Sequence, residues 1–117
     1  MKAVETPWGS YEVLYEDSSY KVKRIIIKPD KRISLQYHKY RNEHWFVVEG
    51  SGMATLGEKE IMLKKGDSLN ILKEQNHRIH NTDRKKALAF IEVQTGTYLE
   101  EDDIVRLHDD FNRAGRC

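Results

Sequence analysis

Short segments that alternate apolar and polar residues, or in which β-branched residues run together, recur along almost the whole of this chain. An alternation with a period of two places every second side chain on one face of a β-strand. Polar and glycine-containing turns separate these segments at the spacing typical of sandwiches and barrels. The pattern predicts an all-β fold, with strands at residues 11–15, 20–27, 33–38, 45–48, 53–56, 60–63, 68–72, 77–81 and 87–94.

The segments outside these strands are expected to be polar and exposed, with one ambiguity near the C-terminal end. Residues 39–42 form a predicted polar loop, and the acidic run 100–103 is a predicted solvated face. The tail carries a short apolar patch at Ile104, Val105 and Leu107 within a charged stretch. This patch is compatible with a final edge strand or with a single helical turn, and the sequence leaves both open.

Length and composition favour one globular domain over residues 1–117. A chain of 117 residues can bury one hydrophobic core but not two independent ones. It is 38% hydrophobic and 33% charged, with 20 basic and 19 acidic side chains. Because charge of neither sign dominates, nucleic acid and membrane surfaces are not expected partners. An all-β chain of this size must close or stack its sheets.

Cysteine content and hydropathy point to a cytoplasmic location. The one cysteine, Cys117, is the last residue, so no disulfide can form within the chain. A reducing compartment is the default for such a chain. No segment approaches the ~18 apolar residues of a membrane-spanning helix.

Four potential metal ligands are placed so that they can converge. Gln36 and His38 lie two residues apart in an expected strand and therefore on the same face. Glu43 starts the strand after the polar loop, and His77 starts another strand. Two imidazoles, a carboxylate and an amide oxygen suit one divalent ion, such as zinc, manganese, iron, cobalt or nickel. The competing interpretation is that these are ordinary polar residues on strand surfaces.

The spacing of these residues resembles the two sequence motifs of the cupin superfamily. The pattern is Gln36-x-His38-x4-Glu43-x6-Gly50, followed by Gly66-x10-His77-x3-Asn81. Glutamine stands where the first histidine is usual, and Leu72 and Glu74 stand where proline and glycine are usual. The resemblance implies a double-stranded β-helix, that is, a jelly-roll barrel, followed by a short C-terminal tail.

A narrower resemblance is carried by blocks that run from Pro7 to Arg113. These blocks are Pro7–Tyr11, Tyr20–Ile25, Ser34–His38, Glu43–Trp45, His77–Arg78, Ile91–Gln94 and Glu101–Arg106. They resemble the type II mannose-6-phosphate isomerase domain, which commonly forms the C-terminal part of enzymes that also carry a mannose-1-phosphate guanylyltransferase. No counterpart of the guanylyltransferase is present in this sequence. The resemblance departs from the usual pattern at Thr6, where arginine is usual, and at Lys39-Tyr40, which replace a histidine-rich loop.

The narrower resemblance implies a metal-dependent isomerase that interconverts mannose 6-phosphate and fructose 6-phosphate through an enediolate, on the route to GDP-mannose. Three side chains are candidate catalytic groups. Glu92 lies among apolar neighbours and is the expected base, unless it faces solvent. Arg106 lies in one of the shared blocks and can donate two hydrogen bonds to oxygen atoms of a ligand, unless it forms a surface ion pair. Lys23 shares a strand face with Ile25 and Ile27, and points inward if they do.

Two other functions fit the same pattern. One is a non-catalytic cupin that binds a sugar or a nucleotide sugar, and the other is a non-haem iron dioxygenase. The resemblance also implies that the domain forms a homodimer and that its ligand is a small sugar phosphate. Trp8 and Trp45 are expected to pack in the core or at a barrel end, and His44 to point away from the face of Glu43.

Overall fold

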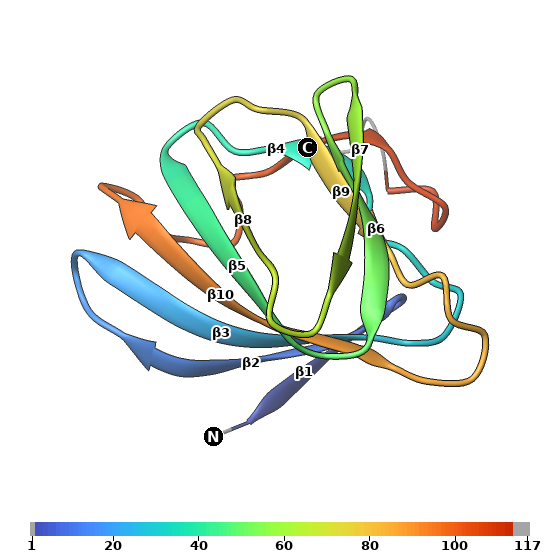
Figure 1. Cartoon of the computed structure of the whole chain (residues 1–117). Coiled ribbons are helices and arrows are strands. Elements are labelled where there is room, and N and C mark those ends of the chain that lie inside the picture. Colours follow the sequence, from blue (N-terminus) through green and yellow to red (C-terminus); the bar gives the residue numbers. More distant parts are fainter. Residues whose placement is uncertain (1, 114–117) are drawn as a thin grey trace.

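The computed structural model describes residues 2–113, which form eleven strands and no helix (Figure 1). The strands are Ala3–Thr6 (β1), Gly9–Glu16 (β2), Tyr20–Ile27 (β3), Leu35–Tyr37 (β4), Arg41–Glu49 (β5), Ser51–Leu56 (β6), Lys59–Lys64 (β7), Ser68–Ile71 (β8), His77–His80 (β9), Leu88–Gly96 (β10) and Val105–His108 (β11). The all-β prediction is confirmed. No helix of these residues is long and apolar enough to cross a membrane.

The strands form two antiparallel sheets that face each other as a barrel (Figure 1). One sheet has the order β1-β2-β3-β10-β5-β8, and the other has the order β11-β4-β9-β6-β7. Neighbours such as β3 and β10 are far apart in sequence, as expected of a double-stranded β-helix. The sheets therefore bring together residues from the middle and from the end of the chain.

Nine of the eleven strands coincide with the predicted ones, and the other two lie at the two ends of the chain. β1 is an exposed edge strand that pairs with β2 across a tight turn, and it buries too little to show an alternating pattern. β11 pairs with β4 and decides the ambiguity of the tail in favour of an edge strand.

Two predictions, one of a loop boundary and one of solvent exposure, were wrong at residues that matter for the site. Arg41 was placed in a polar loop, but it is the first residue of β5 and is buried. The acidic run 100–103 was expected to be solvated throughout, but Asp103 is only 5% exposed. The buried Asp103 side chain accepts hydrogen bonds from the backbone N–H groups of Lys39 and Tyr40, which explains why a carboxylate is tolerated there.

The interior of the larger sheet is divided into an apolar and a polar part. On β3 the inward residues are Lys21 and Lys23 and then Ile25 and Ile27. The same order holds on β10, where the antiparallel register places polar residues beside the two lysines and apolar residues beside the two isoleucines. On β5 the buried Trp45, opposite Glu92, lies where the polar part meets the apolar part. The polar members on β5 and β10 are Arg41, Glu43, Glu92 and Gln94, and the apolar members are Val47, Leu88 and Phe90.

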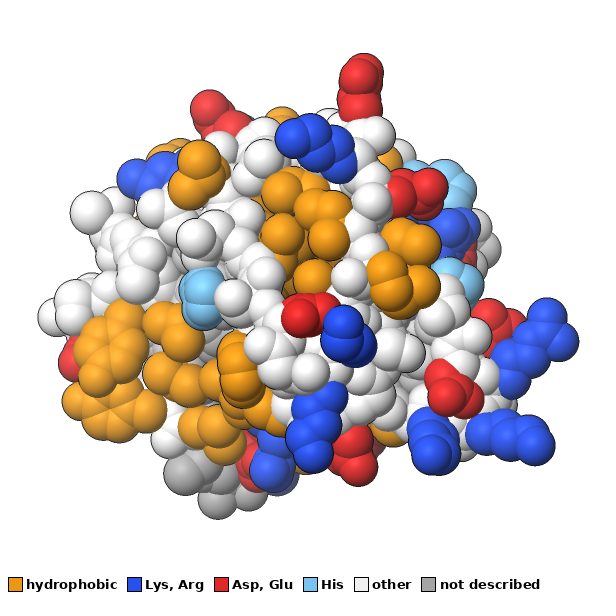
Figure 2. Space-filling model, in the orientation of Figure 1, with side chains coloured by type: hydrophobic (Ala, Val, Ile, Leu, Met, Phe, Trp, Pro, Cys, Tyr) orange, Lys and Arg blue, Asp and Glu red, His pale blue; other side chains and the backbone are white. Residues whose placement is uncertain are grey.

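The apolar part joins side chains of the smaller sheet in one hydrophobic core. Ile27, Leu88 and Ile79 are fully buried there. Figure 2 shows hydrophobic side chains in the space between β8 and β7, the edge strands of the two sheets. The core thus fills one region of the barrel and leaves the polar residues gathered in the other.

Candidate metal centre and adjoining cavity

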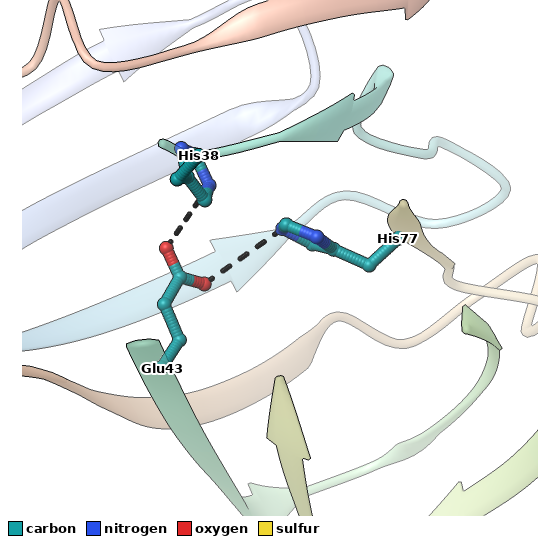
Figure 3. Close-up of side chains that lie close together, drawn as sticks. All are labelled: His38, Glu43 and His77. Atoms are coloured by element: carbon teal, nitrogen blue, oxygen red, sulfur yellow. Dashed lines mark ion pairs between the residues drawn. The ribbon is translucent and has the colours of Figure 1, made fainter. Parts of the chain in front are cut away.

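Three of the four predicted ligands converge inside the barrel (Figure 3). Glu43 projects from β5, His77 from β9, and His38 from the residue after β4. Nε2 of His38 lies 3.1 Å from Oε2 of Glu43, and Nε2 of His77 lies 3.9 Å from Oε1. All three residues are at most 4% exposed. Two imidazoles and a carboxylate are thereby held within one coordination sphere of each other, away from solvent.

Both histidines are oriented by backbone carbonyl groups. Nδ1 of His38 lies 2.6 Å from the carbonyl oxygen of Asp103, and Nδ1 of His77 lies 2.9 Å from that of Gln75. Since a carbonyl only accepts, each Nδ1 carries the donated proton. Nε2 of each ring then faces Glu43, which is the arrangement usual for metal-bound histidines.

The Nε2 atom of His77 is the clearest sign of a ligand site. It is buried and has no hydrogen-bond partner among residues 2–113. Burial lowers the pKa of His77, which favours the neutral ring and its lone pair. An unpaired nitrogen lone pair aimed at a carboxylate is costly unless a cation lies between them, so the residues fit a divalent ion.

Glu43 is held as a carboxylate by its neighbours. Burial acts to raise its pKa, but the hydrogen bond and charge of His38 and the charge of Arg41 hold the pKa of Glu43 well below its usual range. Nε of Arg41 donates to Oε2 at 2.9 Å, and Nε1 of Trp45 donates to Oε1 at 2.9 Å. The group therefore presents an ionised oxygen donor to the histidines.

Gln36, the fourth predicted ligand, borders this cluster. Its Nε2 lies 3.4 Å from Nε2 of His38, and its Oε1 accepts a hydrogen bond from the hydroxyl of Ser34 at 2.6 Å. A hydroxyl can donate or accept, so turning the amide over would present Oε1 to the histidines and keep the Ser34 contact. The place of Gln36 in the ligand set is thus compatible with the geometry and stays a prediction.

Glu92 is buried in the polar part of the barrel, which rules out the alternative that it faces solvent. Its carboxylate accepts hydrogen bonds from Nε1 of Trp45 at 3.2 Å and from Nε2 of Gln94 at 2.6 Å. Burial, followed by the charge of Glu43, raises the pKa of Glu92 to about 7. A carboxyl group of this kind can take up and release a proton near neutral pH.

Lys23 also points inward, as predicted from the face it shares with Ile25 and Ile27. Its Nζ lies 2.6 Å from Oε2 of Glu101 and 4.2 Å from the ring centroid of Tyr11. The charge of Lys23 is therefore already balanced by a carboxylate and an aromatic face. These contacts hold the lysine in the cavity wall.

Arg106 lies on β11 directly opposite Gln36 of β4. Its Nε atom is buried and has no hydrogen-bond partner among the described residues. The predicted alternative, an ion pair with the preceding acidic residues, is not formed: Glu101 pairs with Lys21 and Lys23, and Asp103 binds backbone N–H groups. Arg106 is thus available to a ligand.

A cavity of about 200 Å³ adjoins the three ligands. Its wall includes Gln36, Arg41 and Trp45, each of which contacts one of the three. All three candidate catalytic residues line it as well. The remaining lining side chains are Thr6, Trp8, Tyr11, Ile25, Ile33, Phe90, Glu101, Ile104 and Arg113. The cavity therefore joins an apolar wall to several charged groups, as small-molecule sites commonly do.

The sequence did not single out several residues that shape this site. Arg41, Glu101 and Arg113 line the cavity, and Asp103 positions His38 through its carbonyl group. The available signal was the alternation of β5, since counting back by two from Glu43 places Arg41 on the same inward face. No comparable signal exists for the tail, whose position depends on pairing with β4.

The fold and the buried cluster of two histidines and a glutamate define a cupin domain with a candidate metal-binding site. The chain belongs to the family described as "Mannose-6-phosphate isomerase C-terminal", which matches residues 1–109. The family resemblance seen in the sequence is thereby confirmed.

Curated relatives are similar over almost the whole chain. Xanthan biosynthesis protein XanB of Xanthomonas campestris pv. campestris is 43% identical over 113 residues, which cover 97% of this chain and 24% of that protein. Alginate biosynthesis protein AlgA of Pseudomonas aeruginosa is 44% identical over 111 residues, covering 95% and 23%. Mannose-1-phosphate guanylyltransferase ManC of Salmonella typhimurium is 39% identical, covering 97% and 23%. The chain spans about a quarter of the length of these relatives.

Solved structures share the fold at low identity. CapF of Staphylococcus aureus, a capsular polysaccharide assembling protein, has a TM-score of 0.80 at 19% identity and covers 92% of this chain and 34% of its own. KdgF from Halomonas has a TM-score of 0.77 at 12% identity, covering 87% and 90%. These likenesses confirm the double-stranded β-helix and carry no information on activity.

Proposed function

We propose that this domain is a metal-dependent isomerase that interconverts mannose 6-phosphate and fructose 6-phosphate. The observation that carries the proposal is the convergence of His38, Glu43 and His77 beside a cavity that also contains a buried carboxyl group, Glu92. An aldose–ketose isomerase needs an electrophile for the sugar carbonyl and a base for the neighbouring carbon. The family match supports a sugar phosphate as the substrate.

The metal ion would be held by His38, Glu43 and His77, with Gln36 as the proposed fourth ligand. When bound, it supplies Lewis-acid polarisation of the sugar carbonyl. The donor set contains no thiolate, and we propose zinc, with manganese, iron, cobalt or nickel as alternatives. Elemental analysis of protein purified without chelators or added metals tests this: one equivalent of zinc is expected, and a different dominant ion would replace zinc in the proposal.

Glu92 is the proposed base that moves a proton between the first two sugar carbons. Its side chain lines the cavity, and the N–H groups of Trp45 and Gln94 fix the orientation of the carboxylate. A carboxyl group with a pKa near 7 can take the proton from one carbon and return it to the next. Burial keeps competing water away from the proton during the transfer.

A turnover assay tests the isomerase. Purified protein is stripped with a chelator, reloaded with single divalent metals, and assayed for fructose 6-phosphate formed from mannose 6-phosphate. Turnover that depends on metal is expected. If no metal restores turnover while the sugar phosphate still binds, the domain is a sugar-binding cupin; oxygen consumption in the iron-loaded protein would instead indicate an oxygenase.

A further inference from the structure

The charges that line the cavity do not cancel. Its basic residues are Lys23, Arg41, Arg106 and Arg113. Three of the four have a carboxylate partner: Lys23 pairs with Glu101, Arg41 with Glu43, and Arg113 with Asp109. Among residues 2–113, Arg106 is the cavity arginine without one. A guanidinium whose buried Nε lacks an acceptor is poised to receive an anionic ligand.

Arg106 is held in place by the sheet rather than by other charges. It lies opposite Gln36 in the antiparallel pair of β4 and β11, so both side chains leave the sheet on the same face. Gln36 in turn contacts His38. Arg106 therefore lines the cavity that adjoins the metal-ligand cluster, but it projects from a different strand.

Arg113, whose side chain is partly exposed, adds a second guanidinium group to the cavity wall. Its Nε lies 2.7 Å and its Nη2 3.2 Å from the two oxygens of Asp109, whose side chain is fully buried. This fork leaves Nη1 of Arg113 outside the pair. Burial and then the positive charge of Arg113 lower the pKa of Arg106, and the charge of Asp109 acts in the opposite direction. The two guanidinium groups therefore lie near enough to repel each other.

We propose that Arg106 and Arg113 together bind the phosphate group of the sugar phosphate, with Arg106 as the main contact. Two guanidinium groups suit a phosphate dianion, since each can offer parallel N–H donors to its oxygens. Binding the dianion there satisfies the unpaired Nε of Arg106 and relieves the repulsion between the arginines. Thr6, which lines the same cavity, is uncharged, and its hydroxyl accepts the N–H of Gly9.

This assignment deepens the proposed function, because it presumes that the ligand is a sugar phosphate. The phosphate site would fix one end of the substrate and leave the carbonyl end for Gln36 and the histidines. Inorganic phosphate alone should therefore compete with the substrate.

Titration calorimetry of the full chain with inorganic phosphate, fructose 6-phosphate and fructose tests the assignment. Arg106→Gln should weaken the two phosphate ligands by at least tenfold and leave fructose unchanged, and Arg113→Gln should weaken them less. Arg106→Lys should restore part of the affinity. Arg24→Gln is the matched control, since Arg24 lies on an exposed face and pairs with Glu12.

The possible outcomes distinguish failure of the phosphate-site assignment from failure of the proposed isomerase activity. Unfolding curves confirm that each variant is folded before binding is compared. Unchanged phosphate affinity in folded Arg106→Gln overturns the assignment, even if the protein turns over. Equal loss in Arg24→Gln also overturns it, since binding would then follow net charge. If the protein does not turn over but its phosphate binding depends on Arg106, the phosphate site is supported and the isomerase proposal is rejected.

Discussion

The two parts of the barrel interior are built by the same strands but are stabilised in different ways. In the apolar part, Ile27 and Leu88 face each other across β3 and β10 and are fully buried. Four residues further along the same ladder, Glu92 faces Lys23, and each needs a polar partner. Burial of apolar area stabilises the first part. In the second part, hydrogen bonds and ion pairs must offset the free-energy cost of removing polar groups from water. The comparison indicates that stability and chemistry are separated along the strands.

The largest effect is expected at the polar end, from Glu92→Gln. The amide keeps the shape of the side chain but cannot take a proton, so turnover should fall by about 10²–10⁴-fold. Folding should be nearly unaffected, because the Gln94 amide can turn over and offer its unpartnered Oε1 to the new N–H group. Steady-state kinetics with mannose 6-phosphate measures this, with exposed Glu60→Gln as the control. Turnover within twofold of the parent protein would remove Glu92 from the role of base.

The matching substitution at the apolar end is Leu88→Ala. Loss of a fully buried leucine should lower the free energy of unfolding by about 2–5 kcal/mol, because the transfer term and the cavity term add. Metal affinity of the folded protein should not change. Urea denaturation measures the loss, and Leu72→Ala, at a 61% exposed position, should cost little. A large fall in metal affinity would show that the two parts are coupled.

His77→Leu tests whether the polar part sacrifices stability for metal binding. The substitution removes a ligand, so metal affinity should fall by more than about 100-fold, beyond the loss typical of residues that only support a ligand. In chelator, the free energy of unfolding should fall by no more than about 0.5–1.5 kcal/mol, because Nε2 has no hydrogen-bond partner and only the Nδ1 hydrogen bond to the carbonyl of Gln75 is lost. Calorimetry and urea denaturation are compared with His80→Leu on the same strand. Retained metal affinity would remove His77 from the ligand set.

Asp103→Asn probes the support of His38. Both carboxylate oxygens accept a backbone N–H, from Lys39 at 2.8 Å and from Tyr40 at 3.0 Å, and the amide can replace only one acceptor. We expect a loss of about 1–3 kcal/mol in the free energy of unfolding, with weaker metal binding because the same residue's carbonyl orients His38. Asp102→Asn, at an exposed neighbour, is the control for both measurements. Equal stability of the two variants would contradict this role of Asp103.

The smallest expected effect lies in the turn before His77. Glu74 has a φ of 65°, a left-handed conformation that glycine adopts without strain. Its N–H nevertheless donates to the carbonyl of His38 at 2.7 Å, so the turn closes against the site. Glu74→Gly should raise the free energy of unfolding by about 0.5–1 kcal/mol, whereas Glu74→Ala keeps the strain and should not. A thermal scan that shows both variants equal would indicate that the strain is negligible.

Local patterns in the sequence were sufficient for most of the fold. Alternation and turn residues located nine strands, and the hairpin between β6 and β7 turns between the strands predicted at 53–56 and 60–63. The spacing of Gln36 and His38 and the position of His77 identified the ligand candidates before any contact was known. These features depend on residues near one another in the chain, or on a motif, and a single sequence contains both.

The tertiary structure decided how those residues are supported. Whether Glu92 and Lys23 face inward depended on which face of β10 and β3 meets the core, and that follows from pairing between distant strands. The tail is the clearest case: only its pairing with β4 brings Arg106 beside Gln36 and the carbonyl of Asp103 to His38. A sequence determines which residues alternate and which can bind a metal. Contacts between segments some 65 residues apart depend on the closure of the whole barrel, and the environment of each buried charge depends on those contacts.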